Sequence, residues 1–410
     1  MNKHASNRAS STKGLSVWSI GGSIFAMFFG AGNIVFPLAL GYHYHSHPWF
    51  ACLGMIITAV CVPLLGLVSM LLYVGDYQKF FSSIGKIPGM IFIVAILCLI
   101  GPFGGIPRAI AVSHSTLASL SDKNFTLLPS LHVFSLICCI LIYLFACKLS
   151  KLIQWLGSVF FPIMLATLLW IIFKGLIIPS QPSTIASANI QTSLLAGITE
   201  GFNTMDLLAA FFFCSIVLIS IRQKLANHGD NDAETPLDFK KINKKDKRTL
   251  ILAFILAGLL LGTIYLGFAL CASRHAGLLA HTNKGQILGR ISAIALGPNS
   301  LLTGVCVFIA CLTTEIALVG IVADFLARII SSKRMTYSNA VIFTLIPSYL
   351  ISILNFENIS LLLLPLLQLS YPALIALTCG SIAYKLWNFR HVQALFYLTL
   401  SLTIILRLVG

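Results

Sequence analysis

Four consecutive residues interrupt a long apolar stretch near the start of the chain and could bind a small charged solute through their backbone. The stretch runs from Leu15 to Tyr44, and the interruption is Gly30-Ala31-Gly32-Asn33, followed by Phe36-Pro37. A helix broken in this way frees backbone carbonyls that can coordinate a cation. The N-terminus of the next helical segment carries about half a positive charge and favours a carboxylate. The break therefore predicts a ligand site.

A second group of polar residues precedes another apolar run. Glu200-Gly201-Phe202-Asn203-Thr204-Met205-Asp206 stands directly before the run from Leu207 to Ile221. Near the centre of a lipid bilayer each carboxylate costs about 2.5–3.5 kcal/mol, so it usually faces a cavity, a partner or an ion. For Asp206 we favour a functional role over pairing with a structural donor. Glu200 could equally lie at a membrane interface as part of a helix start.

Two threonines and a carboxylate form the next candidate group, Thr313-Thr314-Glu315. Hydroxyl oxygens suit a weakly bound monovalent cation because they coordinate it without a full opposing charge. A threonine in a membrane helix more often bonds a carbonyl of its own helix. The pair becomes a candidate sodium site if it lies opposite the break at Gly30.

Arg108 follows a stretch with five helix breakers, Gly101-Pro102-Phe103-Gly104-Gly105-Ile106-Pro107. Prolines and glycines in membrane helices are often kinks that neighbouring helices repack. A cation at this depth still needs a counter-charge or carbonyls, and Asp206, Glu200 or Glu315 could supply the charge. We expect Arg108 to serve gating or structural pairing rather than direct substrate contact.

The elements that must position these groups are membrane-spanning helices. Of the 410 residues, 58% are hydrophobic and 10% are charged, and the mean hydropathy is +0.93. A span needs roughly 20 apolar residues, and this length predicts an all-α polytopic membrane protein with eleven transmembrane helices. They centre near residues 28, 60, 103, 139, 165, 208, 260, 315, 345, 372 and 400. The alternative is twelve, if the segment from Leu361 to Trp387, which Pro365 and Pro372 interrupt, contains a further span.

The interrupted first and sixth spans are five spans apart. This spacing predicts a five-plus-five inverted repeat in which two discontinuous helices face each other near the midplane. The predicted units are a cytoplasmic N-terminal tail (1–14), a first repeat with spans one to five (15–178), a second repeat with spans six to ten (192–387) that contains a cytoplasmic loop (222–248), and an additional C-terminal span (391–410).

Charge predicts the orientation of the chain. The formal net charge is +15, and most Lys and Arg residues lie in the N-terminal tail and in every second short connector. By the positive-inside rule the N-terminus is cytoplasmic, and eleven spans then place the C-terminus outside. Because the basic residues occupy connectors between apolar spans, we expect the lipid bilayer as a partner and no nucleic acid.

The sequence gives no sign of an enzyme or a resident cofactor. It contains no nucleotide-binding loop, no His-Glu-x-x-His and no plausible pairing of a nucleophile with a base. Its eleven cysteines lie in apolar segments and read as small buried hydrophobes. His43, His45 and His47 alternate and could ligate zinc, but with no Cys or carboxylate nearby we favour an interfacial loop. We therefore expect no metal site beyond the sodium site.

The motifs resemble a known family over nearly the whole chain. Met27-Phe28-Phe29-Gly30-Ala31-Gly32-Asn33 with Phe36-Pro37, the run from Gly201 to Asp206, and Leu312-Thr313-Thr314 are similar to motifs of the bacterial branched-chain amino acid:cation symporters. The resemblance implies a fold similar to the leucine-transporter class. It also implies sodium-coupled import of leucine, isoleucine and valine through the bacterial cytoplasmic (inner) membrane by alternating access, without an obligatory protein partner.

The same resemblance implies roles for individual residues. Substrate binding would fall to Gly30, Ala31, Gly32, Asn33, Phe202, Asn203, Thr204 and Asp206. The carbonyls of Ala26 and Phe29 with the hydroxyls of Thr313 and Thr314 would hold sodium. Independently of the resemblance, the charges of Arg108, Glu200 and Glu315 inside apolar segments make them candidates for gating or coupling.

Glu315 departs from the family pattern, in which an uncharged residue is expected after the threonine pair. Either it points away from the site or it adds a titratable group that shifts coupling toward protons. The alternative functions are therefore a proton-coupled carrier, a broader neutral amino acid transporter that also accepts methionine, or a channel or sensor on the same fold. One methylene is worth only about 1–3 kcal/mol of discrimination, so the preferred amino acid stays open.

Overall fold

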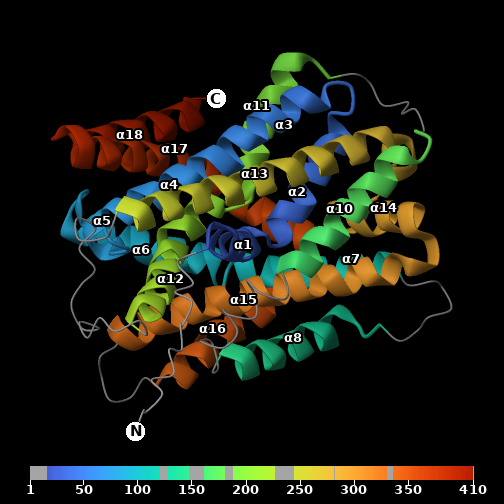
Figure 1. Ribbon diagram of the computed structural model, residues 1–410, viewed down its shortest axis with the longest axis horizontal. Helices are drawn as coiled ribbons and strands as arrows, with labels where there is room; N and C mark the ends of the chain where they lie inside the picture. The colour runs from blue at the N-terminus through green and yellow to red at the C-terminus, as the bar shows by residue number, and fades with distance from the viewer. Residues whose placement is uncertain are drawn as a thin grey trace, which may run out of the picture.

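The computed structural model shows a helical protein whose long helices are interrupted at a few points (Figure 1). It describes residues 16–120, 128–146, 161–180, 188–226, 244–280, 282–329 and 336–409. The helices of the first half are α1 (Val17–Phe28), α2 (Ala31–His43), α3 (Pro48–Ile56), the π-helical η1 (Ile57–Cys61), α4 (Val62–Leu72), α5 (Tyr77–Ser82), α6 (Lys86–Ile100), α7 (Gly105–Leu120), α8 (Leu131–Ala146) and α10 (Phe161–Ile177). Those of the second half are α11 (Ile190–Asn203), α12 (Asp206–Ala226), α13 (Lys244–Arg274), the 3-10 turns η3 (Ala276–Leu279) and η4 (Lys284–Gln286), α14 (Ile287–Leu296), the 3-10 turn η5 (Gly297–Ser300), α15 (Leu301–Ile329), α16 (Tyr337–Ser352), α17 (Asn355–Trp387) and α18 (Val392–Val409).

The first predicted span consists of two helices. The backbone leaves the helical region at Phe29, with ψ 84°, and at Gly30, with ψ −162°. The axes of α1 and α2 consequently differ by 72°. Pro37 lies inside α2 and has no N–H to donate to the Asn33 carbonyl one turn earlier, which leaves a second weak point close to the break.

The sixth predicted span is broken as well. Helix α11 ends at Asn203 and α12 begins at Asp206, with an angle of 41° between them. Met205 between them has φ 61°, a left-handed conformation that is uncommon for a residue other than glycine. The predicted discontinuity of both the first and the sixth span is therefore confirmed.

The predicted apolar windows fall on helices throughout the chain. Five described segments are long and apolar enough to cross a membrane on their own, and the two broken pairs raise this number to seven. Helices α8, α10 and α18 are apolar but shorter. The segment from Leu361 to Trp387 lies within the single helix α17 despite its two prolines, so it holds one span rather than two.

The broken helices lie between two groups of helices. In Figure 1, α1 is seen end-on near the middle, with α3, α4 and α13 on one side and α15, α16 and α8 on the other. On the first side α3 packs against α11, and α13 packs against both α1 and α2. On the second side α15 packs against α7, α8 and α16.

Two glycines bring helices of the first group into backbone contact. A Cβ atom at Gly197 of α11 would lie 1.9 Å from the carbonyl oxygen of Ala51 in α3. A Cβ atom at Gly41 of α2 would lie 2.1 Å from the carbonyl oxygen of Ala269 in α13. No side chain fits at these distances, and close crossing at small residues is a usual mode of helix packing in membranes.

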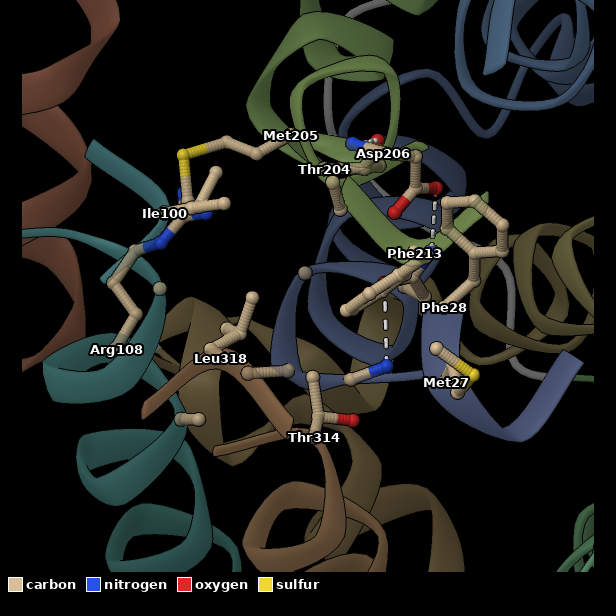
Figure 2. Close-up of a pocket in the computed structure, with 17 residues that line it drawn as sticks. Met27, Phe28, Ile100, Arg108, Thr204, Met205, Asp206, Phe213, Thr314 and Leu318 are labelled. Carbon is tan, nitrogen blue, oxygen red and sulfur yellow. Dashed lines mark hydrogen bonds between the residues drawn. The ribbon is translucent and has the colours of Figure 1, made fainter. Parts of the chain in front are cut away.

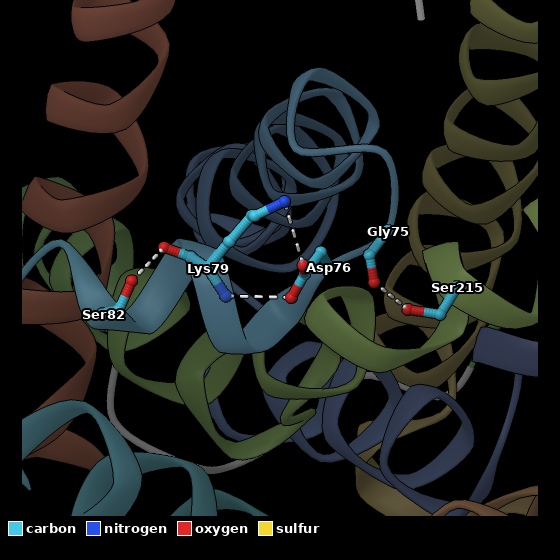
Figure 3. Close-up of polar contacts among 5 residues, drawn as sticks. All are labelled: Gly75, Asp76, Lys79, Ser82 and Ser215. Atoms are coloured by element: carbon cyan, nitrogen blue, oxygen red, sulfur yellow. Dashed lines mark hydrogen bonds and ion pairs between the residues drawn. The ribbon is translucent and has the colours of Figure 1, made fainter. Parts of the chain in front are cut away.

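The connector between α4 and α5 is fastened to the second broken span (Figure 3). Ser215 of α12 donates a hydrogen bond of 2.6 Å from Oγ to the carbonyl oxygen of Gly75. Asp76 caps α5, because its Oδ1 accepts the backbone N–H of Lys79 at 2.9 Å. The hydrogen bond from Ser215 therefore joins α12 directly to this connector.

Each of the predicted units includes residues outside the described part of the chain. The tail 1–14 lies entirely outside it. The predicted loop 222–248 overlaps two helices, since α12 continues to Ala226 and α13 begins at Lys244, and residues 227–243 are outside the described part. The division into repeats at 15–178 and 192–387 stays a prediction.

Candidate functional site

A cavity of about 50 Å³ lies where the two broken spans meet (Figure 2). Its wall combines the two breaks with one face each of α7, α12 and α15 and the end of α6. The lining residues are Met27, Phe28, Gly30, Ala31, Gly32, Asn33, Ile100, Gly105, Arg108, Ala109, Thr204, Met205, Asp206, Ala209, Phe213, Thr314 and Leu318. Most of this wall is apolar, and its polar groups come mainly from the breaks.

Three buried side chains, which we call the clasp, join the two breaks. Asn33 Nδ2 donates to Asp206 Oδ2 at 2.7 Å and also contacts the hydroxyl of Tyr265 on α13. Tyr265 in turn donates to Asp206 Oδ2 at 3.2 Å. Asn33 Oδ1 accepts the backbone N–H of Gly30 at 3.3 Å, which ties the break to its own helix. Asp206 lies in the first turn of α12, where the helix dipole favours a carboxylate.

A chain of polar contacts leads from the cavity to the turn after α13. Arg108 Nη1 donates to the carbonyl oxygen of Asn203 at 2.9 Å, and Asn203 Nδ2 donates to Glu200 Oε2 at 2.8 Å. Glu200 Oε1 forms an ion pair of 3.0 Å with Lys284 Nζ, and the backbone N–H of Lys284 donates to Glu357 of α17 at 3.0 Å. Arg108 is expected to need either a counter-charge or a backbone carbonyl, and the structure provides the carbonyl. Glu200 lies in the last turn of α11, so its expected place at a helix start is wrong.

The threonine pair lies next to the first break but makes helical bonds of its own. Both hydroxyls donate to the carbonyl oxygen of Ala310, Thr313 at 2.8 Å and Thr314 at 3.2 Å. A Cβ atom at Gly30 would lie 3.2 Å from Thr314 Cγ2, so α15 touches the break directly. The Gly30 N–H bonds to Phe28 instead of continuing the helix, which leaves the carbonyl of Ala26 outside the α1 ladder.

A second cavity of about 40 Å³ lies beside the first, between α1, α10 and α15. It is lined by Ala26, Ile163, Met164, Cys306, Ile309, Ala310 and Thr313. Two members of the predicted cation group, Ala26 and Thr313, thus share this cavity, while Thr314 lines the larger one. Phe29 is fully buried and lines neither.

Glu315 points away from both cavities. It is buried, and the thiols of Cys138, Cys139 and Cys311 lie near it. Its Oε1 has no hydrogen-bond partner among the described residues. Of the two expectations for this carboxyl, the placement fits the one in which it turns away from the site.

The cavity gathers most of the predicted substrate-binding residues. Gly30, Ala31, Gly32, Asn33, Thr204 and Asp206 line it. Phe202 and Asn203 do not, since Phe202 packs against Tyr371 with ring centroids 4.7 Å apart and Asn203 belongs to the polar chain. No group of three or more His, Cys, Asp or Glu side chains that could hold a metal ion occurs in the described residues.

Sequence reasoning missed several residues of this site. Tyr265 lies in an unbroken apolar helix, and its only sequence signal is a hydroxyl inside a span. Lys284 and Glu357 belong to none of the sequence motifs, so nothing local signals their part in the polar chain. Ala310 acts through its carbonyl and has no side-chain signal, although it precedes Thr313 and Thr314 by three and four residues, a spacing that one helical turn brings together.

Comparison with known proteins assigns the chain to a family. The model of a family described as branched-chain amino acid transport protein matches residues 13–409. The chain belongs to this family. The transporter is 31% identical over 379 residues to a protein named as a branched-chain amino acid carrier in Staphylococcus saprophyticus, which covers 88% of the chain and 80% of the relative. It is 29% identical over 387 residues to the branched-chain amino acid permease BrnQ of Lactobacillus delbrueckii subsp. lactis, covering 92% of the chain and 82% of that protein.

Solved structures show the same fold for the transporter. Mhp1, a nucleobase-cation-symport-1 family transporter, in a closed conformation with bromovinylhydantoin bound, superimposes with a TM-score of 0.61 at 15% identity, over 93% of this chain and 81% of that one. A substrate-bound, outward-open Na⁺-coupled sialic acid symporter gives a TM-score of 0.58 at 12% identity, over 95% and 88% of the two chains. Family and fold are those of multi-pass membrane transporters rather than enzymes, which confirms the predicted resemblance and fold class.

Proposed function

We propose that the transporter imports leucine, isoleucine and valine by symport with sodium, in an alternating-access cycle and with its N-terminus in the cytoplasm. The meeting of two broken spans on one largely apolar cavity carries this proposal. The charged ends of the amino acid would bind at the Gly30–Asn33 break, Thr204 and Asp206. Its branched side chain would lie against apolar wall residues such as Ile100 and Leu318.

The proposed sodium site lies between the first break and α15. The carbonyls of Ala26, Phe29 and Ala310 and the hydroxyls of Thr313 and Thr314 are its oxygen donors. Support comes from the shared second cavity of Ala26, Ala310 and Thr313 and from the contact between Thr314 and Gly30. A cation here would hold α1 against α15 and thereby stabilise the break in its substrate-binding form.

Coupling to an ion supplies the driving force. Moving one positive charge inward across a potential of 100 mV releases about 2.3 kcal/mol. Since about 1.4 kcal/mol corresponds to a tenfold concentration ratio, the potential alone supports an accumulation of about fortyfold. An amino acid held at the break can be carried against its gradient only if the ion and the substrate leave together.

Uptake into proteoliposomes tests the coupling ion. An inward sodium gradient at equal pH should drive accumulation of labelled leucine, and a pH gradient without sodium should not. Accumulation that follows the pH gradient alone would contradict sodium symport and favour proton coupling. Sodium-driven accumulation of methionine that competes equally with leucine would favour the broader neutral amino acid carrier, and conduction without saturation would favour a channel.

Thr314→Ala tests the location of the sodium site. Because the hydroxyl is one of five proposed donors, the sodium concentration for half-maximal leucine uptake should rise several-fold. Thr263→Ala is the matched control, since Thr263 makes the same kind of bond to its own helix, Oγ1 to the Leu259 carbonyl at 2.7 Å, on an exposed face of α13. Equal sodium dependence in both variants would remove this assignment.

A further inference from the structure

The buried guanidinium of Arg108 has no anionic partner among the described residues. Only 2% of the residue is exposed, Nη1 bonds to a backbone carbonyl, and Nε has no hydrogen-bond partner in the described part of the chain. No carboxylate of the described residues lies within 4.0 Å of it. The group lies over the Phe36 ring, 5.6 Å from the centroid, which contributes only weak compensation. Arginine stays protonated at physiological pH, so a charge in this position calls for an anion.

Asp206 carries the opposite charge across the same cavity. Arg108 and Asp206 are the two charged residues among those that line it, and Figure 2 shows them on opposite sides. Both clasp contacts of Asp206 use Oδ2, and the Thr204 hydroxyl is the further hydrogen-bonding group beside this carboxylate, so Oδ1 has room to accept from a ligand. Each charge thus keeps unused hydrogen-bonding capacity, and the space between them prevents the two from pairing directly.

We propose that Arg108 binds the α-carboxylate of the substrate while Asp206 Oδ1 binds its α-ammonium group, so that the cavity recognises a zwitterion by two opposed charges. The inference rests on the proposed function, but it moves the carboxylate of the amino acid from the Gly30–Asn33 break to Arg108. A substrate carboxylate placed at the clasp instead would face the carboxylate of Asp206 and be repelled. At Arg108 the same group compensates a charge that the protein leaves uncompensated, and a bidentate fork is available for it.

The competing role of Arg108 is that of a brace between α7 and α11 through the Asn203 carbonyl. The two roles predict different effects of removing Arg108. If Arg108 is a brace, its removal should lower the affinity for every transported molecule by the same factor. If Arg108 binds the substrate carboxylate, its removal should lower the affinity only for molecules that carry a carboxylate.

Two leucine analogues separate these roles. Leucinamide, used below neutral pH where its amine is protonated, lacks the carboxylate charge, and 4-methylpentanoate lacks the ammonium group. Inhibition of labelled leucine uptake is measured in proteoliposomes at saturating sodium for the full chain, for Arg108→Met and Arg108→Lys, and for Asp206→Asn. Arg328→Met is the control, because Arg328 pairs with Asp324 on an exposed surface.

In the unchanged chain leucinamide should inhibit at least about tenfold more weakly than leucine. Arg108→Met should lower the affinity for leucine about ten- to a hundredfold, as expected for loss of a hydrogen bond to a charged group. The affinity for leucinamide should change by no more than about twofold. The ratio of the two inhibition constants should therefore fall toward one. Arg108→Lys should lie between. Asp206→Asn should reduce the preference for leucine over 4-methylpentanoate instead.

An unchanged ratio of leucinamide to leucine in Arg108→Met would overturn the proposal and identify a brace. If that variant transports too slowly, stabilisation of the purified protein against heat by each ligand gives the same ratio. The ratio does not depend on which ion is coupled. A failure of sodium symport is therefore recognised separately, by the gradients that drive uptake in the unchanged chain.

Discussion

Replacing Tyr265 by phenylalanine removes one hydroxyl from the clasp and leaves the ring in place. The hydroxyl contacts Asn33 and donates to Asp206, and the three residues are 0%, 2% and 3% exposed. After the change Asp206 Oδ2 keeps only the bond from Asn33. The variant therefore isolates how strongly α13 holds the two breaks together.

Two estimates bracket the effect. Hydrogen bonds to charged groups contribute about 1.5–3 kcal/mol in soluble proteins, whereas polar contacts between membrane helices average about 0.6 kcal/mol. Because the acceptor is a carboxylate and water is excluded from all three side chains, we expect a value near 2 kcal/mol. This corresponds to a change of about thirtyfold in the population that has the breaks assembled.

Leucine uptake and thermal unfolding of Tyr265→Phe measure this loss. The concentration for half-maximal uptake should rise by more than tenfold, and the melting temperature should fall. Tyr143→Phe is the matched control, because its hydroxyl bonds to Ser338 between α8 and α16 without touching a carboxylate or a break. If both variants transport leucine like the unchanged chain, the clasp does not hold the site.

Three further substitutions test other parts of the molecule. Gly41→Ala should lower the yield and melting temperature of the purified protein severely, because the new Cβ would lie 2.1 Å from the Ala269 carbonyl oxygen; a normal melting curve would contradict this packing. Glu200→Lys should reduce leucine uptake about fivefold, because a partly exposed ion pair is worth at most about 1 kcal/mol. Adding Lys284→Glu should restore uptake. A double variant as slow as the single one would show that the ion pair is not the cause of the loss. Glu315→Gln should leave the sodium dependence of uptake unchanged, because the side chain faces away from both cavities, and a shifted dependence measured in the same assay would place it in the coupling machinery.

Local chemistry carried much of the prediction. The breaks at Gly30 and Met205 could be predicted because glycine and polar residues interrupt long apolar runs there. An unbroken membrane helix would not need such residues. Apolar length alone placed the predicted windows on helices. Six of the eight substrate-binding residues predicted from these motifs line one cavity in the structure.

The contacts that complete the site could not be read from neighbours in sequence. Tyr265 lies 232 residues from Asn33, and Lys284 lies 84 residues from Glu200. Such pairs depend on how whole helices pack, which the local pattern does not encode. For Phe202 the sequence motif and the packing differ, because the motif predicts it in the site while its ring packs against Tyr371 and lies outside the cavity lining.

The backbone contacts at Gly197 and Gly41 decide where the molecule is able to hinge. Helices whose backbones touch cannot slide past each other. We therefore expect α11 to move together with α3, and α2 to move together with α13. The break at the start of α2 and the break at the end of α11 thus belong to different pairs of helices. In the alternating-access cycle that we propose, the distance between the two breaks would change only when one pair moves against the other.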